Sequence, residues 1–163
     1  MGVFLKSWDL INLAIHIEES GRQAYEYFES RAVDEKLRSL WALLKGEEIA
    51  HARVFEDMLR ALPEAGTEHA AADASHAFVR AVAASYVFTE RRLAKVLLED
   101  VCSDLDALAY GVYIEKETIL TYITIKNNVP PADVPVVDRI IDEEKQHLVK
   151  LTALINGLSG QQR

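Results

Sequence analysis

The sequence predicts an all-α protein built as a four-helix bundle, and three observations support this. Glycine and proline are scarce, with 7 and 4 in 163 residues, and the long segments between them are rich in residues that favour helices. Four of these segments place apolar residues three and four apart, which is the pattern of a helix that buries one face. No stretch has the pattern of a strand pair. We expect one domain, residues 1–163.

The first two helices are predicted over residues 8–31 and 35–61. Ser7 is the expected N-cap of the first, and Pro63 follows the end of the second. In both, acidic residues interrupt the apolar stripe that should face the core. The predicted stripes are Ile11, Ala14, Glu18, Gly21, Tyr25 and Phe28 in the first helix, and Leu37, Trp41, Leu44, Glu48, His51, Phe55, Met58 and Leu62 in the second.

Two further helices are predicted, one from Ser103 or Asp104 to Lys126 and one over residues 133–158. A run of asparagines and prolines ends the earlier of the two. Acidic residues again stand within the stripes. These are Leu105, Leu108, Val112, Glu115, Ile119 and Tyr122, and then Val137, Ile140, Glu144, His147, Leu151 and Leu154.

Residues 63–102 separate the second and third predicted helices and are too many for a tight hairpin. Bundles that run up and down join neighbouring helices by short loops, whereas a long crossover at this position is typical of ferritin-like bundles. Residues 75–100 within this segment have a helical pattern of their own. We therefore expect a ferritin-like four-helix bundle with an extra helix in its crossover, packed outside the bundle or at a subunit contact.

Charge and cysteine content exclude several classes of protein. The formal charge of −8 disfavours nucleic acid and anionic membranes as partners. The single cysteine, Cys102, rules out a disulfide within one chain and any metal site made of paired cysteines. The first residues lack a signal-peptide pattern and no apolar run is long enough to cross a bilayer. We expect a soluble, cytoplasmic protein.

Six polar residues at the middle of the predicted stripes are candidate metal ligands. A glutamate and a histidine three apart on a helix project from one face and can hold one ion. Such a pair is common by chance, but here two pairs and two further glutamates all face the predicted core. Four buried carboxylates need compensation, and two divalent cations provide it. The six residues are Glu18, Glu48, His51, Glu115, Glu144 and His147.

Carboxylate and imidazole ligands together suit iron, with manganese and zinc as alternatives. Glu47 and Glu143 also precede the two histidines, but each lies about 100° off the apolar stripe. We therefore prefer Glu48 and Glu144 as ligands.

Tyr25 and Tyr122 are the candidate catalytic residues. Each stands two helical turns after a lone glutamate, Glu18 or Glu115, so the two halves of the chain match. One interpretation is that these aromatic rings simply fill the core. The other is that their hydroxyl groups donate hydrogen bonds to ligand carboxylates, and the matched spacing favours it.

Four short motifs, one in each predicted helix, resemble those of rubrerythrin-type ferritin-like di-iron proteins. The motifs are Ala14-Ile15-His16-Ile17-Glu18 with Tyr25, Glu48-Ile49-Ala50-His51 with Phe55, Ile114-Glu115-Lys116 with Tyr122, and Glu144-Lys145-Gln146-His147-Leu148. The resemblance implies that Glu18 and Glu115 are terminal ligands, that Glu48 and Glu144 bridge the ions, and that His51 and His147 bind one ion each.

The resemblance also implies an activity, with two departures from the family pattern. Such proteins oxidise ferrous iron and reduce peroxide or dioxygen to water. This chain has no rubredoxin domain, so electrons must come from a separate rubredoxin-like protein or from ferrous iron. Thr118 stands where rubrerythrins carry a further glutamate, which favours a symmetric six-ligand centre of the ferroxidase type.

The expected function is therefore that of a di-iron oxidoreductase, of the ferroxidase or peroxidase type, in oxidative-stress defence or iron handling. We expect a homodimer. The alternatives are a non-catalytic iron-binding or storage protein, and a helical interaction module that needs no metal.

Overall fold

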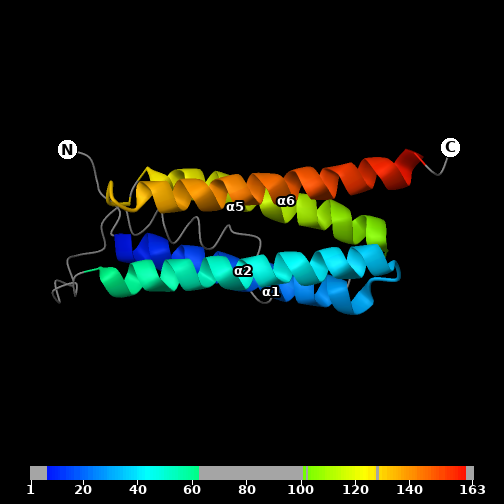
Figure 1. The fold of residues 1–163 in the computed structure, drawn as a ribbon, viewed down its shortest axis with the longest axis horizontal. Coiled ribbons are helices and arrows are strands. Elements are labelled where there is room, and N and C mark those ends of the chain that lie inside the picture. The colour runs from blue at the N-terminus through cyan, green and yellow to red at the C-terminus, as the bar shows by residue number, and fades with distance from the viewer. Residues whose placement is uncertain (1–6, 63–100, 102, 128, 161–163) are drawn as a thin grey trace.

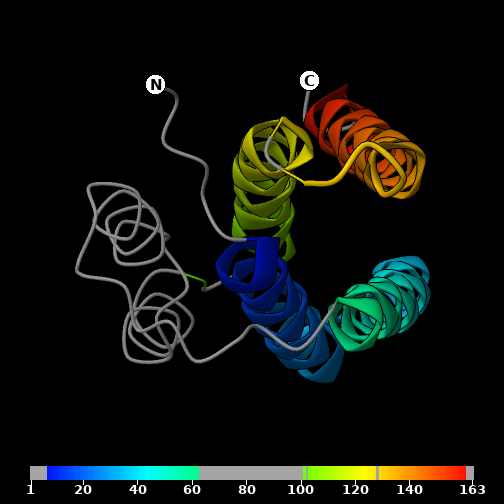
Figure 2. The ribbon, with the colours of Figure 1, turned by 90° about the vertical axis from the view of Figure 1, so that its left-hand side faces the viewer.

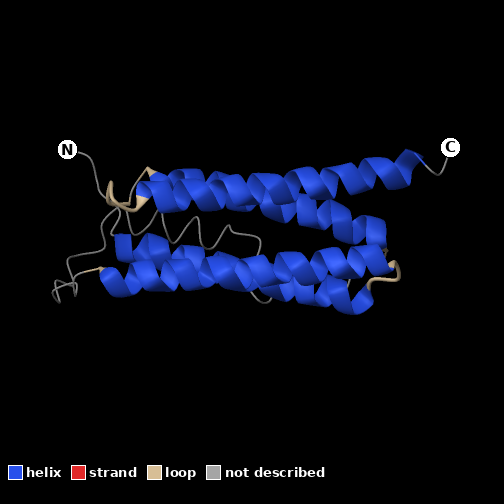
Figure 3. Cartoon of the chain, in the orientation of Figure 1, coloured by secondary structure: helices blue, strands red, loops and turns tan. Residues whose placement is uncertain are grey.

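The computed structural model describes residues 7–62, 101, 103–127 and 129–160 (Figure 1). All regular structure in this part of the chain is helical (Figure 3), which confirms the predicted fold class. The predicted extra helix at residues 75–100 lies outside the described residues, as does Cys102. The helices are α1 (Ser7–Arg31), α2 (Glu35–Ala61), α5 (Asp104–Lys126) and α6 (Val134–Gly160).

The helices form two hairpins, α1 with α2 and α5 with α6, which are joined through packing of α1 against α5 (Figure 2). Helices α1 and α6 run in one direction and α2 and α5 in the other, so α2 ends and α5 begins at opposite ends of the bundle (Figure 1). This order requires a long connection between them, as in ferritin-like bundles. Among the described helices, none is both long and apolar enough to cross a bilayer.

Side-chain caps fix where two of the helices begin. The Asp34 carboxylate accepts hydrogen bonds from the backbone N–H groups of Lys36, at 2.7 Å, and Leu37, at 3.4 Å. The Ser103 hydroxyl accepts one from the backbone of Asp106 at 3.2 Å. The predicted starts of these two helices are confirmed. Ser7, predicted as a cap, is instead the first residue of α1.

Replacing Asp34 by alanine should lower the free energy of unfolding by about 1 kcal/mol, because two N–H groups at the start of α2 lose their acceptor. Denaturant unfolding of the two proteins measures this difference. A suitable control is Glu35→Ala, which removes an exposed ion pair with Arg38 and a negative charge in the first turn of α2 but leaves the Asp34 cap in place. Equal midpoints for wild type and Asp34→Ala would contradict the capping role.

The core follows the predicted stripes in α1, α2 and α6, apart from half-buried Leu62 and Leu154 near helix ends. In α5 the predicted stripe is partly wrong. Leu105 is 41% exposed and Val112 and Ile119 are only half-buried. The buried face of α5 instead consists of Ala107, Leu108, Gly111, Ile114, Glu115, Thr118, Thr121, Tyr122 and Ile125.

The rotation of α5 has a physical reason. Apolar residues surround most of this helix, so their spacing alone does not fix which side faces inward. A Cβ atom on Gly111 would lie 3.2 Å from both Leu151 Cδ1 and Trp41 Cη2. The indole of fully buried Trp41 therefore packs against the one position of α5 that has no side chain.

Candidate metal centre

The six candidate ligands converge in the middle of the bundle, and none of them is more than 3% exposed. Helices α1 and α5 contribute one glutamate each, and α2 and α6 contribute a glutamate and a histidine each. The residues form two groups. In each group, every residue offers one ligand atom, and these atoms all lie within 4.8 Å of one another. The groups are Glu18, Glu48, His51 and Glu144, and Glu48, Glu115, Glu144 and His147.

Glu48 and Glu144 belong to both groups, so the two groups share one carboxylate from α2 and one from α6. Glu144 lies between the two imidazoles. Its Oε1 is 2.9 Å from His51 Nδ1, and its Oε2 is 2.9 Å from His147 Nδ1. Two adjacent ions with shared carboxylates would use this arrangement in full.

Unpaired buried atoms show that the site fits metal ions. Within the described residues, the buried side-chain atoms that make no hydrogen bond of good geometry include Glu18 Oε2, Glu115 Oε2, both carboxylate oxygens of Glu144, and Nδ1 of His51 and His147, although the Glu144 oxygens lie 2.9 Å from the two nitrogens. Leaving such an atom buried without a partner costs roughly 1–3 kcal/mol. All six belong to the two ligand groups, so cations bound there would pair every one of them.

Each candidate tyrosine contacts a glutamate from the other half of the chain. The Tyr25 hydroxyl donates to Glu115 Oε1, and the Tyr122 hydroxyl donates to Glu18 Oε1. Both tyrosines are fully buried. Both interpretations made from the sequence therefore apply: each ring fills the core, and each hydroxyl donates a hydrogen bond to a candidate ligand. Burial raises the pKa of the Tyr25 hydroxyl well above its usual value, so this group keeps its proton.

Glu47 and Glu143 make contacts that the sequence did not predict. Neither belongs to the two ligand groups. Glu143 Oε2 lies 2.7 Å from His51 Nε2, and Glu47 Oε2 lies 2.8 Å from His147 Nε2. Each carboxylate thus contacts the histidine of the opposite helix, not the one on its own helix. A doubled glutamate before both histidines was the only sequence signal, and helix geometry alone does not reveal a contact between helices.

Gly21 makes room for one of the shared carboxylates. A Cβ atom at this position of α1 would lie 2.8 Å from Glu48 Oε2 and 3.0 Å from its Cδ. Any larger residue would therefore displace the Glu48 carboxylate. The sequence placed Gly21 on the inward stripe, but only the structure shows what lies against it.

Comparison with known proteins agrees with this geometry. The model of the rubrerythrin family matches residues 9–155. The chain belongs to the rubrerythrin family. The crystal structure of a Thermotoga maritima protein, described as a ferritin-like diiron-carboxylate protein, aligns with a TM-score of 0.67 and 20% sequence identity. The alignment covers 96% of this chain and 98% of that chain, which shows the shared fold. A search of curated proteins gave no match.

Burial and the neighbouring imidazoles set the charges of this rubrerythrin-family site. Burial, together with nearby carboxylates, raises the pKa of Glu48 well above its usual value. Burial also raises the pKa of Glu115 to about 8, although the contact with His147 acts to lower it. Burial opposes ionisation of Glu144, but the two imidazoles lower its pKa to about 2. At neutral pH Glu115 therefore mostly holds its proton, and Glu144 is ionised.

The two histidines hold protons as well. Burial lowers the pKa of each imidazole, but the contacts with carboxylates outweigh it. Glu144 and Glu18 raise the pKa of His51 to about 11, and Glu115 and Glu144 raise that of His147 to about 10. Protons thus supply the positive charge that the buried carboxylates need when metal is absent.

Metal binding at pH 7 should release close to one proton from each of three groups, Glu115, His51 and His147, whose pKa values of about 8, 11 and 10 lie above 7. Protons compete with metal for the same atoms, so the affinity for metal should fall as the pH falls. Adding Zn²⁺ to weakly buffered metal-free protein with a pH indicator measures the release. A release of fewer than two protons per chain would contradict these charge states.

Replacing Gly21 by alanine should weaken metal binding by at least roughly tenfold, equal to about 1.4 kcal/mol, because the new methyl group displaces Glu48. The bundle should keep its helicity, since alanine favours helices. Zn²⁺ titration against a competing chelator measures the affinity. Gly46→Ala is the matched control, since a Cβ atom at Gly46 meets nothing within 4 Å. Equal losses in both variants, or none in either, would contradict the role of Gly21.

Proposed function

We propose that this protein is a di-iron oxidoreductase that oxidises ferrous iron with hydrogen peroxide or dioxygen. The observation that carries the proposal is the pair of ligand groups that share Glu48 and Glu144. Two ferrous ions held there would each give up one electron, and together these are the two electrons that the reduction of hydrogen peroxide to water requires. In this proposal Glu18 and Glu115 are terminal ligands, and His51 and His147 bind one ion each.

The residues around the site support this chemistry in two ways. First, the aromatic side chains that pack above and below it exclude water: Tyr25 stacks on Trp41, with ring centroids 5.6 Å apart, and Phe55 packs on Tyr122 at 5.3 Å. Burial strengthens every electrostatic contact within the site. Second, the hydroxyl groups of Tyr25 and Tyr122 donate hydrogen bonds to Oε1 of Glu115 and Oε1 of Glu18. These contacts orient both carboxylates.

Two parts of the site bear on the electron source and the type of reaction. Thr118 is buried one turn after Glu115, so this position offers no further carboxylate. The proposed centre is therefore the symmetric six-ligand type. The single cysteine excludes a rubredoxin-type iron site in these 163 residues. The proposed electron source is ferrous iron or a separate rubredoxin-like donor protein.

Anaerobic loading with two equivalents of Fe²⁺, followed by stoichiometric hydrogen peroxide, tests the proposal. We expect a near-ultraviolet oxo-ferric absorption band to form within the mixing time of a stopped-flow instrument and to form again after re-reduction. Peroxide consumption over many cycles would support an oxidoreductase. Iron that binds but is oxidised no faster than free Fe²⁺ would contradict it and indicate an iron-binding protein.

A further inference from the structure

Two half-exposed carboxylates contact the buried histidines in a crossed arrangement. Glu143 of α6 contacts His51 of α2, and Glu47 of α2 contacts His147 of α6. The glutamate side chains are 45% and 37% exposed, whereas the two histidine side chains are only 4% and 1% exposed. Each pair therefore extends from the buried site to the surface of the bundle.

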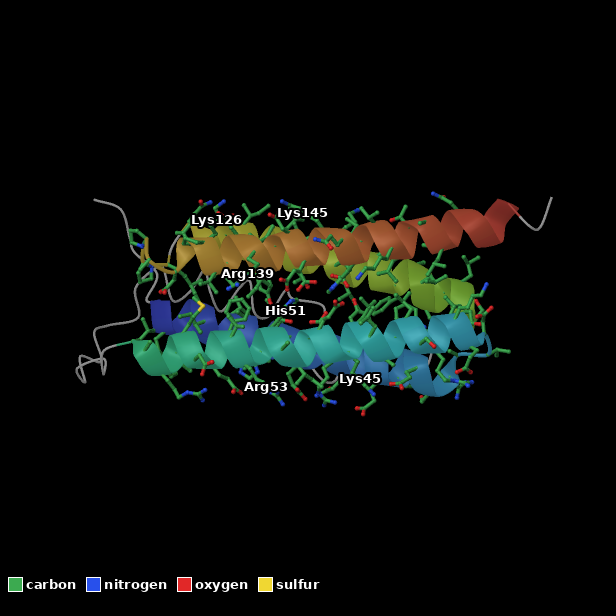
Figure 4. All side chains as sticks on the ribbon, in the orientation of Figure 1. Lys45, His51, Arg53, Lys126, Arg139 and Lys145 are labelled. Atoms are coloured by element: carbon green, nitrogen blue, oxygen red, sulfur yellow. The ribbon has the colours of Figure 1, made fainter. Side chains whose placement is uncertain are left out.

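These contacts lie on the side of the bundle where α2 faces α6. The backbones of α1 and α2, of α5 and α6, and of α1 and α5 pack closely, whereas those of α2 and α6 approach at few points. In Figure 2 the four helices form an arc with α2 and α6 at its two ends. The polar contacts of His51, His147, Glu47 and Glu143 span this side. In Figure 4, His51 lies on the side of α2 that faces α6.

The atoms used in these contacts determine which nitrogen of each ring is available for metal. The carboxylates of Glu143 and Glu47 lie against Nε2 of the two histidines, and Nδ1 of each ring lies 2.9 Å from Glu144. An imidazole that donates its Nε2–H to an acceptor presents the lone pair of Nδ1 to a ligand. The two rings are nearly parallel, with an interplanar angle of 19° and centroids 6.1 Å apart, so both present Nδ1 in the same way.

We propose that Glu143 and Glu47 are positioning residues: Glu143 accepts the Nε2 proton of His51 in a hydrogen bond, Glu47 holds Nε2 of His147 through a charge contact at 2.8 Å, and both so turn Nδ1 toward the metal site. This inference rests on the proposed di-metal centre. Because both contacts cross from α2 to α6, they also tie the ligands on these two helices to each other. An ordinary surface ion pair would contribute only about 0–1 kcal/mol to stability and would not affect metal affinity.

Zinc affinity of matched variants tests the proposal, with Zn²⁺ and a competing chromophoric chelator as the probe. Glu143→Leu should weaken binding by roughly 10–100-fold, the range for residues that orient a ligating histidine. Glu143→Gln should lose less, because its amide oxygen still accepts the proton. The Glu47 variants should follow the same pattern through His147: Glu47→Leu should lose more zinc affinity than Glu47→Gln. The control is Asp142→Asn, next to Glu143 on the outer face, where the carboxylate contacts only exposed Lys145.

Nuclear magnetic resonance of the Zn²⁺-loaded protein, with ¹⁵N-labelled histidine, gives a readout that a merely structural role would not change. In the wild type both rings should bind zinc through Nδ1 and show an Nε2–H proton that exchanges slowly with water. In Glu143→Leu that proton should exchange faster on His51 alone, and in Glu47→Leu on His147 alone.

Three results would overturn the inference, and they differ in what else they affect. Two of them would refute the positioning role but leave the metal centre in place. One is zinc bound through Nε2 in the wild type, and the other is a leucine variant that keeps both wild-type zinc affinity and a slowly exchanging Nε2–H proton. A wild-type protein that does not bind Zn²⁺ or Fe²⁺ at all would refute the proposed centre itself.

Discussion

Replacing Glu144 by alanine should remove both ions from the centre. Glu144 belongs to both ligand groups, and its two oxygens face the Nδ1 atoms of His51 and His147. Its loss takes one ligand from each ion, together with the charge that keeps the two imidazoles in place. The loss of affinity should exceed the roughly 10–100-fold expected for a residue outside the ligand set. Glu48→Ala should act in the same way, since Glu48 is the other shared carboxylate.

Metal content after purification, and affinity by chelator competition, measure this effect. Glu143→Ala and Glu47→Ala are the controls, because each removes a neighbouring carboxylate of the same helix that contacts Nε2 of a histidine and lies outside both ligand groups. These controls should still bind two ions at high metal concentration. Equal loss of metal from all four variants would show that the assignment of ligands is off by one position.

Removing the metal should lower the melting temperature by roughly 10 °C. Metal that binds the native state, but hardly binds the unfolded chain, stabilises by about 4 kcal/mol when its concentration is 1,000 times the dissociation constant. In a protein of this size each kcal/mol shifts the melting temperature by about 2–4 °C. The unpaired nitrogen and oxygen atoms of the site are the structural reason, since bound cations pair atoms that are otherwise buried without partners.

Thermal melts of metal-free and Fe²⁺-loaded protein under anaerobic conditions measure this difference. The Glu144→Ala variant serves as the control, because added Fe²⁺ should leave its melting temperature unchanged. Identical melting temperatures for metal-free and loaded wild type would mean that the six residues do not form a coupled buried site.

The sequence predicted most of the fold because its helix signals are strong. Asp34 and Ser103 occupy cap positions, and the inward stripes of α1, α2 and α6 have the spacing of helices that bury one face. The convergence of the six polar residues followed from the same spacing, since charged groups at the middle of four buried faces must meet. For α5 the same method gave a face that is partly wrong, because apolar residues surround most of the helix. Contacts with other helices fix its rotation, namely the packing of Trp41 against Gly111 and the hydrogen bonds that Glu115 and Tyr122 make with α1.

What the sequence could not predict depends on contacts between helices. Spacing along α2 relates Glu47 to His51, but its actual partner is His147 of α6. The distance and rotation between two helices determine that contact, and neither is encoded by periodicity within one helix. The fit of the Glu48 carboxylate against Gly21 is missed for the same reason.

Equilibrium dialysis of metal-free protein against Fe²⁺ under anaerobic conditions tests the two-ion centre most directly. Two ligand groups that share Glu48 and Glu144 predict that binding saturates at two ions per chain. Saturation at one ion, no binding, or uptake that continues without saturation would contradict a centre built from these six residues.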